Sequence, residues 1–424
     1  MSVSLIAPIS LIMFVVTIVV GIKKRVNLGI LATAMAFVLG LFVMVEGGAM
    51  AAPELKGAPI TSLFPFSIFW MTLSVSLMLN VGSVNGTFDL VIKKVVRLAR
   101  GRRALIPIYV FLVMFVACSV GAGSTGVMVL LSTIAATIAK DQKIDPVFML
   151  LAVLSGSTVA IGSPVAVIGI ICNGLSEQLW GEAIAPSYMY LHGAAMAVLS
   201  FAVIYLLFRG WKLESWPVSK AEEAPRLSKK QILTLLGFLV FIVLAMGLNF
   251  DMGLIAFLVT AVLLLLGCAE EKQVIADAPW SSILMICGMC MLIGVVQAAG
   301  GIDLLTGLMS HMMNRYTVKP LYSILGSVLA MVSSITGVVL PTMIPTIPGI
   351  AAQTGADPYA LVTSLAFGAN ITCASPISAL GAVALGIMGT NPEWDSNKLF
   401  KRMFVYSFVL MGVAAVWAAI GVAG

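Results

Sequence analysis

The polar groups that could bind a ligand gather in four short segments of an otherwise apolar chain. Residues 121–126 and 333–337 are rich in Gly, Ser and Thr, and residues 156–164 and 368–376 each end in Ser-Pro. Proline removes a backbone amide and clashes with the preceding helical turn, and glycine lowers helix stability. Non-helical backbone at membrane depth is tolerated only where protein buries it or a wet cavity lines it. One such segment would indicate a packing kink, but four in symmetric positions predict a binding site.

The chemistry of this site is limited by its lack of charge. No Lys, Arg, Asp, Glu or His occurs within residues 104–139, 146–175, 320–356 or 358–392, which leaves hydroxyls, a carboxamide and free backbone. The amino ends of half-helices carry a positive dipole and unpaired N–H groups, which suit a carboxylate or another oxyanion. Carbonyl and hydroxyl oxygens suit a hard cation such as sodium. Because proton-coupled carriers keep a buried ionisable relay, the sequence favours a cation-coupled carrier of an anion.

Composition places these segments in a membrane. The chain is 60% apolar and 10% charged, whereas soluble domains hold about 25% charged residues. The net charge of +6 does not indicate nucleic acid, because the basic residues lie in short loops between apolar spans. Cys287 and Cys290 form a CxxC in an apolar run, which indicates small buried residues instead of a metal or redox site. No nucleophile, acid–base pair or metal cluster lies at membrane depth, so we expect neither enzyme activity nor a covalent cofactor.

Apolar runs predict an all-α polytopic membrane protein of about ten transmembrane helices, two re-entrant hairpins and two broken helices. A spanning helix needs about 20 apolar residues. Runs 104–139 and 320–352 are too long for one helix and too short for two, so we expect each to be two half-length helices meeting at a tip inside the membrane. The alternative is that each run crosses twice, but the tips lack the charge, Asn or Asp of a hydrated turn. The full set of runs is 4–22, 27–45, 64–84, 104–139, 146–175, 188–208, 231–248, 252–268, 281–299, 320–352, 358–388 and 399–422.

Basic residues orient the spans. With the amino terminus outside and both hairpins re-entrant, all of the 24 basic residues except Lys56, Arg315 and Lys319 lie in the cytoplasm. We therefore expect a multi-pass protein of the bacterial inner (plasma) membrane with both termini periplasmic. The first span is predicted to be retained, because its basic residues follow the apolar run, whereas those of a cleavable signal precede it. Residues 89–103 and 302–319, which precede the hairpins, are predicted to be interfacial helices.

The chain divides into two related halves, residues 1–226 and 227–424. The Asp-Pro that begins at Asp145 recurs at Asp357, and the same shift superimposes the two Ser-Pro breaks. Each half holds five crossings, and because five is odd the second half runs opposite to the first. Such inverted-topology repeats are typical of secondary transporters. The hairpin and broken helix are residues 104–139 and 146–175 in the first half, and 320–352 and 358–388 in the second.

At these segments the sequence resembles the ion transporter superfamily, and within it the divalent anion–sodium symporters and the malonate/dicarboxylate carriers. Those families carry Ser-Asn-Thr at each hairpin tip, where this chain has Gly123-Ser124-Thr125 and Ser334-Ile335-Thr336. Only the threonine matches at both tips. The breaks Gly162-Ser163-Pro164 and Ala374-Ser375-Pro376 are similar to the family's Gly-Thr-Pro and Ala-Thr-Pro. The resemblance implies a homodimer, one sodium ion between each hairpin tip and its facing break, and an elevator movement.

The resemblance also implies site residues for substrate and ion. The residues expected to bind substrate are Ser124, Thr125, Gly126, Ser163, Pro164, Thr336, Gly337, Ser375 and Pro376. The residues expected to bind sodium are Ser119, Gly123, Thr158, Gly162, Ser333, Asn370 and Ala374.

Two functions remain open from the sequence. The first is sodium-coupled uptake of a small dicarboxylate of the malonate, succinate, malate or fumarate type by an elevator mechanism. The second is an exchanger or proton-coupled carrier of another organic or inorganic anion on the same fold, because Ser124 and Ile335 stand where the family has asparagine. The partners expected in either case are a small anionic substrate, the lipid bilayer and a second copy of the chain, and no nucleic acid.

Overall fold

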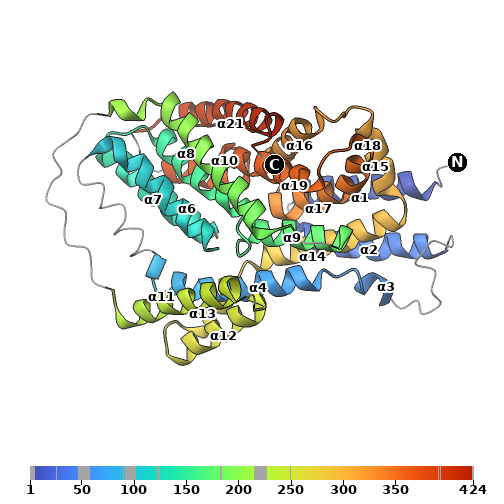
Figure 1. Ribbon diagram of the computed structural model, residues 1–424, viewed down its shortest axis with the longest axis horizontal. Coiled ribbons are helices and arrows are strands. Elements are labelled where there is room, and N and C mark those ends of the chain that lie inside the picture. Colours follow the sequence, from blue (N-terminus) through green and yellow to red (C-terminus); the bar gives the residue numbers. More distant parts are fainter. Residues whose placement is uncertain are drawn as a thin grey trace.

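The chain forms an assembly of helices that lie mostly along one long axis (Figure 1). The structure is a computed structural model, and it describes residues 5–24, 26–45, 58–88, 90, 102–121, 125–181, 184–213, 227–248, 250–389, 391 and 393–422. Every regular element within these ranges is helical, which confirms the all-α fold. In Figure 1, α11, α12 and α13 lie along the lower edge of the molecule and α21 lies along the upper edge.

Among the described residues, the predicted first half contains four helices before its hairpin. The hairpin arms are followed by a broken helix and one long helix. The bounds are α1 Ile6–Lys24, α2 Leu28–Val45, α3 Ala58–Thr61, α4 Phe66–Val84, α6 Ile106–Ser119, α7 Thr125–Asp141, α8 Pro146–Ser157, α9 Val167–Trp180 and α10 Pro186–Leu207.

The second half repeats this order. Its hairpin arms are α16 and a continuous helical segment that includes α17 and α18, and its broken helix is α19 and α20. The bounds are α11 Lys229–Ile242, α12 Met252–Leu265, α13 Glu271–Ala276, α14 Trp280–Ala298, α15 Gly301–Ser310, α16 Val318–Val332, α17 Leu340–Met343, α18 Ile347–Thr354, α19 Pro358–Ile371, α20 Ala379–Gly389 and α21 Ser396–Ala419.

Helix length and composition identify a multi-pass membrane protein. Among the described residues, 5 helical segments are long and apolar enough to cross a membrane, and several other apolar helices are shorter. Each predicted crossing coincides with a helix or with a broken pair of helices. Of the predicted interfacial helices, 302–319 includes α15, whereas most of 89–103 lies outside the described residues. The segments that can cross by themselves are 66–84, 186–207, 271–298, 335–354 and 396–419.

The two hairpins differ in the length of their arms. Helices α6, α7 and α16 have 14, 17 and 15 residues, which is about 21 to 26 Å at 1.5 Å per residue. The fourth arm, 335–354, has 20 residues, so it is longer than the predicted half-length helix. It continues through π and 3₁₀ turns because Pro341, Pro345 and Pro348 each stand in the first turn of a new segment, where a missing amide costs little. Re-entry of both hairpins stays a prediction.

Close helix contacts repeat with the shift seen in the sequence. A Cβ on Gly156 of α8 would stand 2.6 Å from the Phe111 carbonyl oxygen of α6, and one on Gly368 of α19 would stand 2.0 Å from the Ser323 oxygen of α16. The members of these two pairs are related by 212 residues. Helices that precede the hairpins pack across the two halves, since α2 packs on α14 and α12 packs on α4. Most of the predicted junction between the halves lies outside the described residues, and the inverted orientation of the second half stays a prediction.

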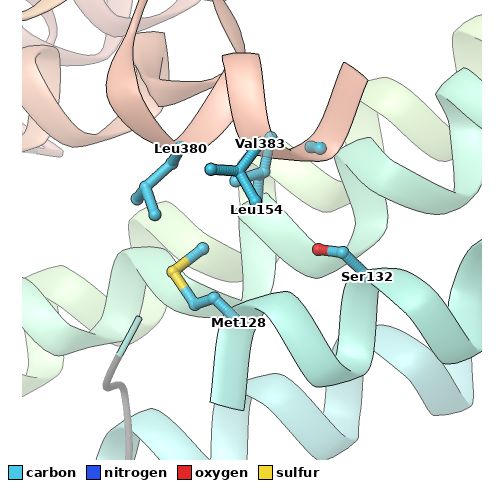
Figure 2. Close-up of a pocket in the computed structure, with 6 residues that line it drawn as sticks. Met128, Ser132, Leu154, Leu380 and Val383 are labelled. Carbon is cyan, nitrogen blue, oxygen red and sulfur yellow. The ribbon is translucent and has the colours of Figure 1, made fainter. Parts of the chain in front are cut away.

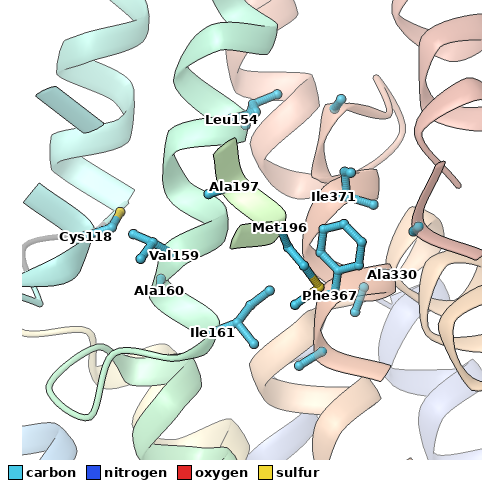
Figure 3. Close-up of a cluster of buried hydrophobic side chains, with 14 of the residues drawn as sticks. Cys118, Leu154, Val159, Ala160, Ile161, Met196, Ala197, Ala330, Phe367 and Ile371 are labelled. Carbon is cyan, nitrogen blue, oxygen red and sulfur yellow. The ribbon is translucent and has the colours of Figure 1, made fainter. Parts of the chain in front are cut away.

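The main hydrophobic core lies between the broken helices (Figure 3). Met196 of α10 is fully buried beside Phe367 of α19, and Ile161, at the end of the 3₁₀ turn that follows α8, points toward the same ring. These three side chains come from both halves. The core therefore fixes the two breaks relative to each other.

Candidate functional site

Both predicted helix breaks are present, and both begin with a capped helix. Asp145 accepts hydrogen bonds from the Val147 and Phe148 amides at 2.9 and 3.4 Å, and this fixes the start of α8. Asp357 accepts from the amide of Tyr359 at 3.1 Å at the start of α19. Each helix ends in a 3₁₀ turn, at Thr158–Ile161 and Thr372–Ala374.

The breaks are shorter than the sequence indicated. Gly156 and Gly368, which the sequence placed inside the breaks, lie within the helices α8 and α19. Both are close-contact positions with no room for a Cβ, so their role is packing. The non-helical backbone is confined to residues 162–166 and 375–378.

The end of the first hairpin meets the first break. The Ser163 hydroxyl donates to the Ser119 carbonyl oxygen at 2.8 Å, so two predicted site residues from different helices are in contact. Gly121 has a positive φ of 87°, and a Cβ there would stand 2.6 Å from the Val165 carbonyl oxygen. Gly162 is buried in the same break, against the backbone of α10. Hydroxyl and carbonyl oxygens thus gather at this junction.

The first hairpin tip is described only in part. Thr125 and Gly126 form the first turn of α7, at its amino end. The predicted residues Gly123 and Ser124 lie outside the described residues.

The second hairpin tip is a two-residue extended link. Ser333 and Ser334 have extended backbone between α16 and the helical segment that begins at Ile335. The Ser334 hydroxyl accepts from the Gly337 amide at 3.2 Å and lies 3.4 Å from the Thr336 hydroxyl. Ser334 therefore caps this arm, a role that the sequence did not assign to it although serine is a preferred N-cap residue. Gly337 is buried, with the side chain of Met285 on α14 at its Cα.

The second break is buried and hydrogen-bonded to its own backbone. Ala374, Ser375 and Pro376 are buried, and the Ser375 hydroxyl accepts from the Ile377 amide at 3.4 Å. The Ser375 carbonyl oxygen accepts from the Ser378 hydroxyl at 2.8 Å. These contacts hold a turn at residues 375–378 before α20 begins.

At the centre, the two halves meet through a pair of equivalent residues. The Asn370 side-chain amide donates to the Thr158 hydroxyl across 3.5 Å, and both residues are at most 5% exposed. The two positions are related by the shift of 212 residues. Thr158 and Asn370 were predicted to bind sodium, and the structure places them in contact with each other.

The residue that precedes each broken helix is an aspartate, and it contacts the other half of the chain. The second carboxylate oxygen of Asp145 lies 2.6 Å from Arg402 Nη2 on α21. The phenol of Tyr188 on α10 interacts with the Asp357 carboxylate. Each broken helix is thereby tied to the last long helix of the other half. Among the described residues no group of three or more His, Cys, Asp or Glu could hold a metal ion, so a cation here would have oxygen ligands from hydroxyls and backbone.

A separate pocket between α7, α8 and α20 does not match this chemistry (Figure 2). Among the described lining residues, Ser132 alone has a polar side chain. The other lining residues are Met128, Leu154, Leu380, Val383 and Ala384. A carboxylate would lose its hydration there without gaining partners.

Comparisons with known proteins agree with this arrangement. Residues 1–162 match the family model described as the dicarboxylate carrier protein MatC N-terminus. The fold is similar to that of the Alcanivorax borkumensis YdaH transporter, whose crystal structure is reported to have an unusual topology. That likeness has a TM-score of 0.66 at 14% identity and covers 93% of this chain and 97% of that one. No curated protein sequence matches. The chain therefore has the fold of a multi-pass membrane transporter.

Proposed function

We propose that this chain is a sodium-coupled carrier that takes up a small dicarboxylate by an elevator movement. The observation that carries the proposal is the contact between Ser119 and Ser163, where the hairpin end meets the break in a region without charged side chains. The match of the first 162 residues to a dicarboxylate carrier model supports the substrate class. The same residues hold the first hairpin and the first arm of the first broken helix.

Sodium is the cation that suits the oxygens of this junction. The Ser119 carbonyl and the Ser163 hydroxyl have neutral, hard oxygen atoms, which can bind a small hard cation. Neither group has to lose a proton to do so, whereas a proton relay needs an ionisable side chain. Each sodium ion entering along a membrane potential contributes about 2.3 kcal/mol per 100 mV. We expect one ion at this junction and a second near Ser333, Asn370 and Ala374.

The anion would be bound by helix amino ends. The segments that begin at Thr125, at Val167, at Ile335 and at Ala379 all start at a tip or a break. Four amino ends supply N–H groups and positive dipoles for two carboxylates without any Arg or Lys.

The proposal also includes the membrane, the oligomeric state and the orientation of the carrier. We place it in a bacterial inner membrane as a homodimer with both termini periplasmic, and we assign it no catalytic activity. The exposed apolar residues of α1, α2, α11 and α12 support contact of these helices with lipid or with a second copy.

Proteoliposome transport tests the function directly. We expect uptake of labelled malonate or succinate to require an inward sodium gradient and to saturate. Thr336→Val, which removes the hydroxyl at the second tip, should lower uptake at least tenfold, whereas Thr137→Val, at an exposed position of α7, should not. Uptake that persists in sodium-free choline buffer would refute the coupling. Exchange of internal for external anion without any ion gradient would support the exchanger instead.

A further inference from the structure

Tyr190 of α10 reaches the junction of the first hairpin and the first break. Its hydroxyl donates to the Ser119 hydroxyl at 2.9 Å, and the Ser119 hydroxyl donates in turn to the Phe115 carbonyl oxygen at 2.8 Å. The Ser119 carbonyl oxygen accepts from Ser163. Ser119 is therefore held on one side by α10 and on the other by the break. Tyr190 was not among the site residues that the sequence indicated.

Helix α10 is itself fixed to the break on both sides of Tyr190. A Cβ on Gly162 would stand 2.0 Å from the Met189 carbonyl oxygen, and one on Gly193 would stand 3.1 Å from the Gly162 amide. Met189 and Gly193 are buried. Because backbone lies against backbone at these points, the Tyr190 ring starts from a rigid base. The hydrogen bond from its hydroxyl therefore restrains Ser119 at the hairpin end.

The repeat shows that this arrangement belongs to one half only. The residue 212 positions after Tyr190 is Arg402, which pairs with Asp145 at the start of α8 and not with the second hairpin tip. The fold therefore does not require the side chain at this position to bind a hairpin end. A residue that differs between the halves and contacts one hairpin end is a candidate for setting the properties of that end.

We propose that Tyr190 is a positioning residue that sets the sodium affinity of the first junction. It holds Ser119 so that the carbonyl oxygen of Ser119 and the hydroxyl oxygen of Ser163 face one cation together. The inference rests on the proposed sodium coupling. One neutral hydrogen bond of this kind changes an affinity by roughly threefold to tenfold.

The test compares Tyr190→Phe with Tyr188→Phe on the same helix. The Tyr188 phenol interacts with Asp357 at the start of α19, so Tyr188→Phe controls for loss of a phenol from α10. Uptake is measured in proteoliposomes over a sodium series at saturating malonate or succinate. The melting temperature of each purified variant is also measured over NaCl, with choline chloride as control, because a bound ion stabilises the folded state by mass action.

We expect Tyr190→Phe to raise the half-saturating sodium concentration about fivefold, with a maximal rate within twofold of the parent, and Tyr188→Phe to leave it unchanged. Ser119→Ala removes the acceptor of the same hydrogen bond, so it should give a similar shift, and the double variant should add little to either change. Sodium-dependent parent uptake with an unshifted Tyr190→Phe variant overturns this inference alone. Parent uptake and melting that ignore sodium overturn the proposed function and the inference with it.

Discussion

Gly368 provides the most direct test of the packing that holds the second broken helix. In Gly368→Ala, the new Cβ would stand 2.0 Å from the Ser323 carbonyl oxygen and 2.7 Å from its hydroxyl. Folded proteins essentially never show a Cβ contact below 3.0 Å. Because the new Cβ would clash with the backbone of α16, α16 and α19 would have to move apart.

The magnitude follows from that geometry. Forcing atoms into a packed core costs about 1–3 kcal/mol and more where backbone must shift, so we expect about 3 kcal/mol for Gly368→Ala. With an unfolding entropy of roughly 2 cal/mol/K per residue, this lowers the melting temperature of the chain by about 3 °C. Gly156→Ala meets the Phe111 oxygen at 2.6 Å and should cost less. Gly386→Ala on α20 meets nothing within 4 Å and should stabilise by about 0.5–1 kcal/mol, because alanine favours a helix.

Melting temperature and uptake measured on the three variants check this order. Gly368→Ala should melt lowest and lose most of its uptake, because the separated helices carry the second tip and the second break. Gly386→Ala is the matched control for a glycine-to-alanine change in an apolar helix. A Gly368→Ala protein that melts at or above the temperature of Gly386→Ala would refute the close packing of α16 on α19.

Two further contacts, both away from the tips, can be tested by substitution. Asp145→Asn keeps the helix cap but loses the charge opposite Arg402. Because the pair is partly exposed, we expect the free energy of unfolding to fall by about 0.5–1 kcal/mol. Asp145→Ala also loses the cap, so its free energy of unfolding should fall by about 1 kcal/mol more, and thermal unfolding measures both changes. Tyr322→Phe removes the buried hydrogen bond to the Thr346 hydroxyl, so we expect a loss of about 1 kcal/mol, whereas Tyr316→Phe, at an 85% exposed residue, should melt like the parent. Equal melting temperatures of Tyr322→Phe and Tyr316→Phe would contradict the hydrogen bond between Tyr322 and Thr346. Equal melting temperatures of Asp145→Asn and Asp145→Ala would contradict the helix cap.

Local signals in the sequence determined where helices start and stop. The Asp-Pro pairs at Asp145 and Asp357 predict helix starts, and both aspartates cap their helices. The Ser-Pro pairs at Ser163 and Ser375 predict breaks, and both lie in non-helical backbone. These signals act through proline, glycine and side-chain caps within a few residues, so no tertiary structure is needed to read them. Together with the lengths of the apolar runs, these signals predict the all-α fold and the order of hairpins and broken helices.

Only the tertiary structure decided which of these segments meet. The contact of Thr158 with Asn370 and that of Tyr190 with Ser119 join residues far apart in the chain. Neither pair has a local signal, because a helix presents several faces and an apolar sequence does not specify the partner of each one. Gly156 shows the same limit: a glycine that weakens a helix and a glycine that admits a neighbouring backbone look identical until the neighbour is in place.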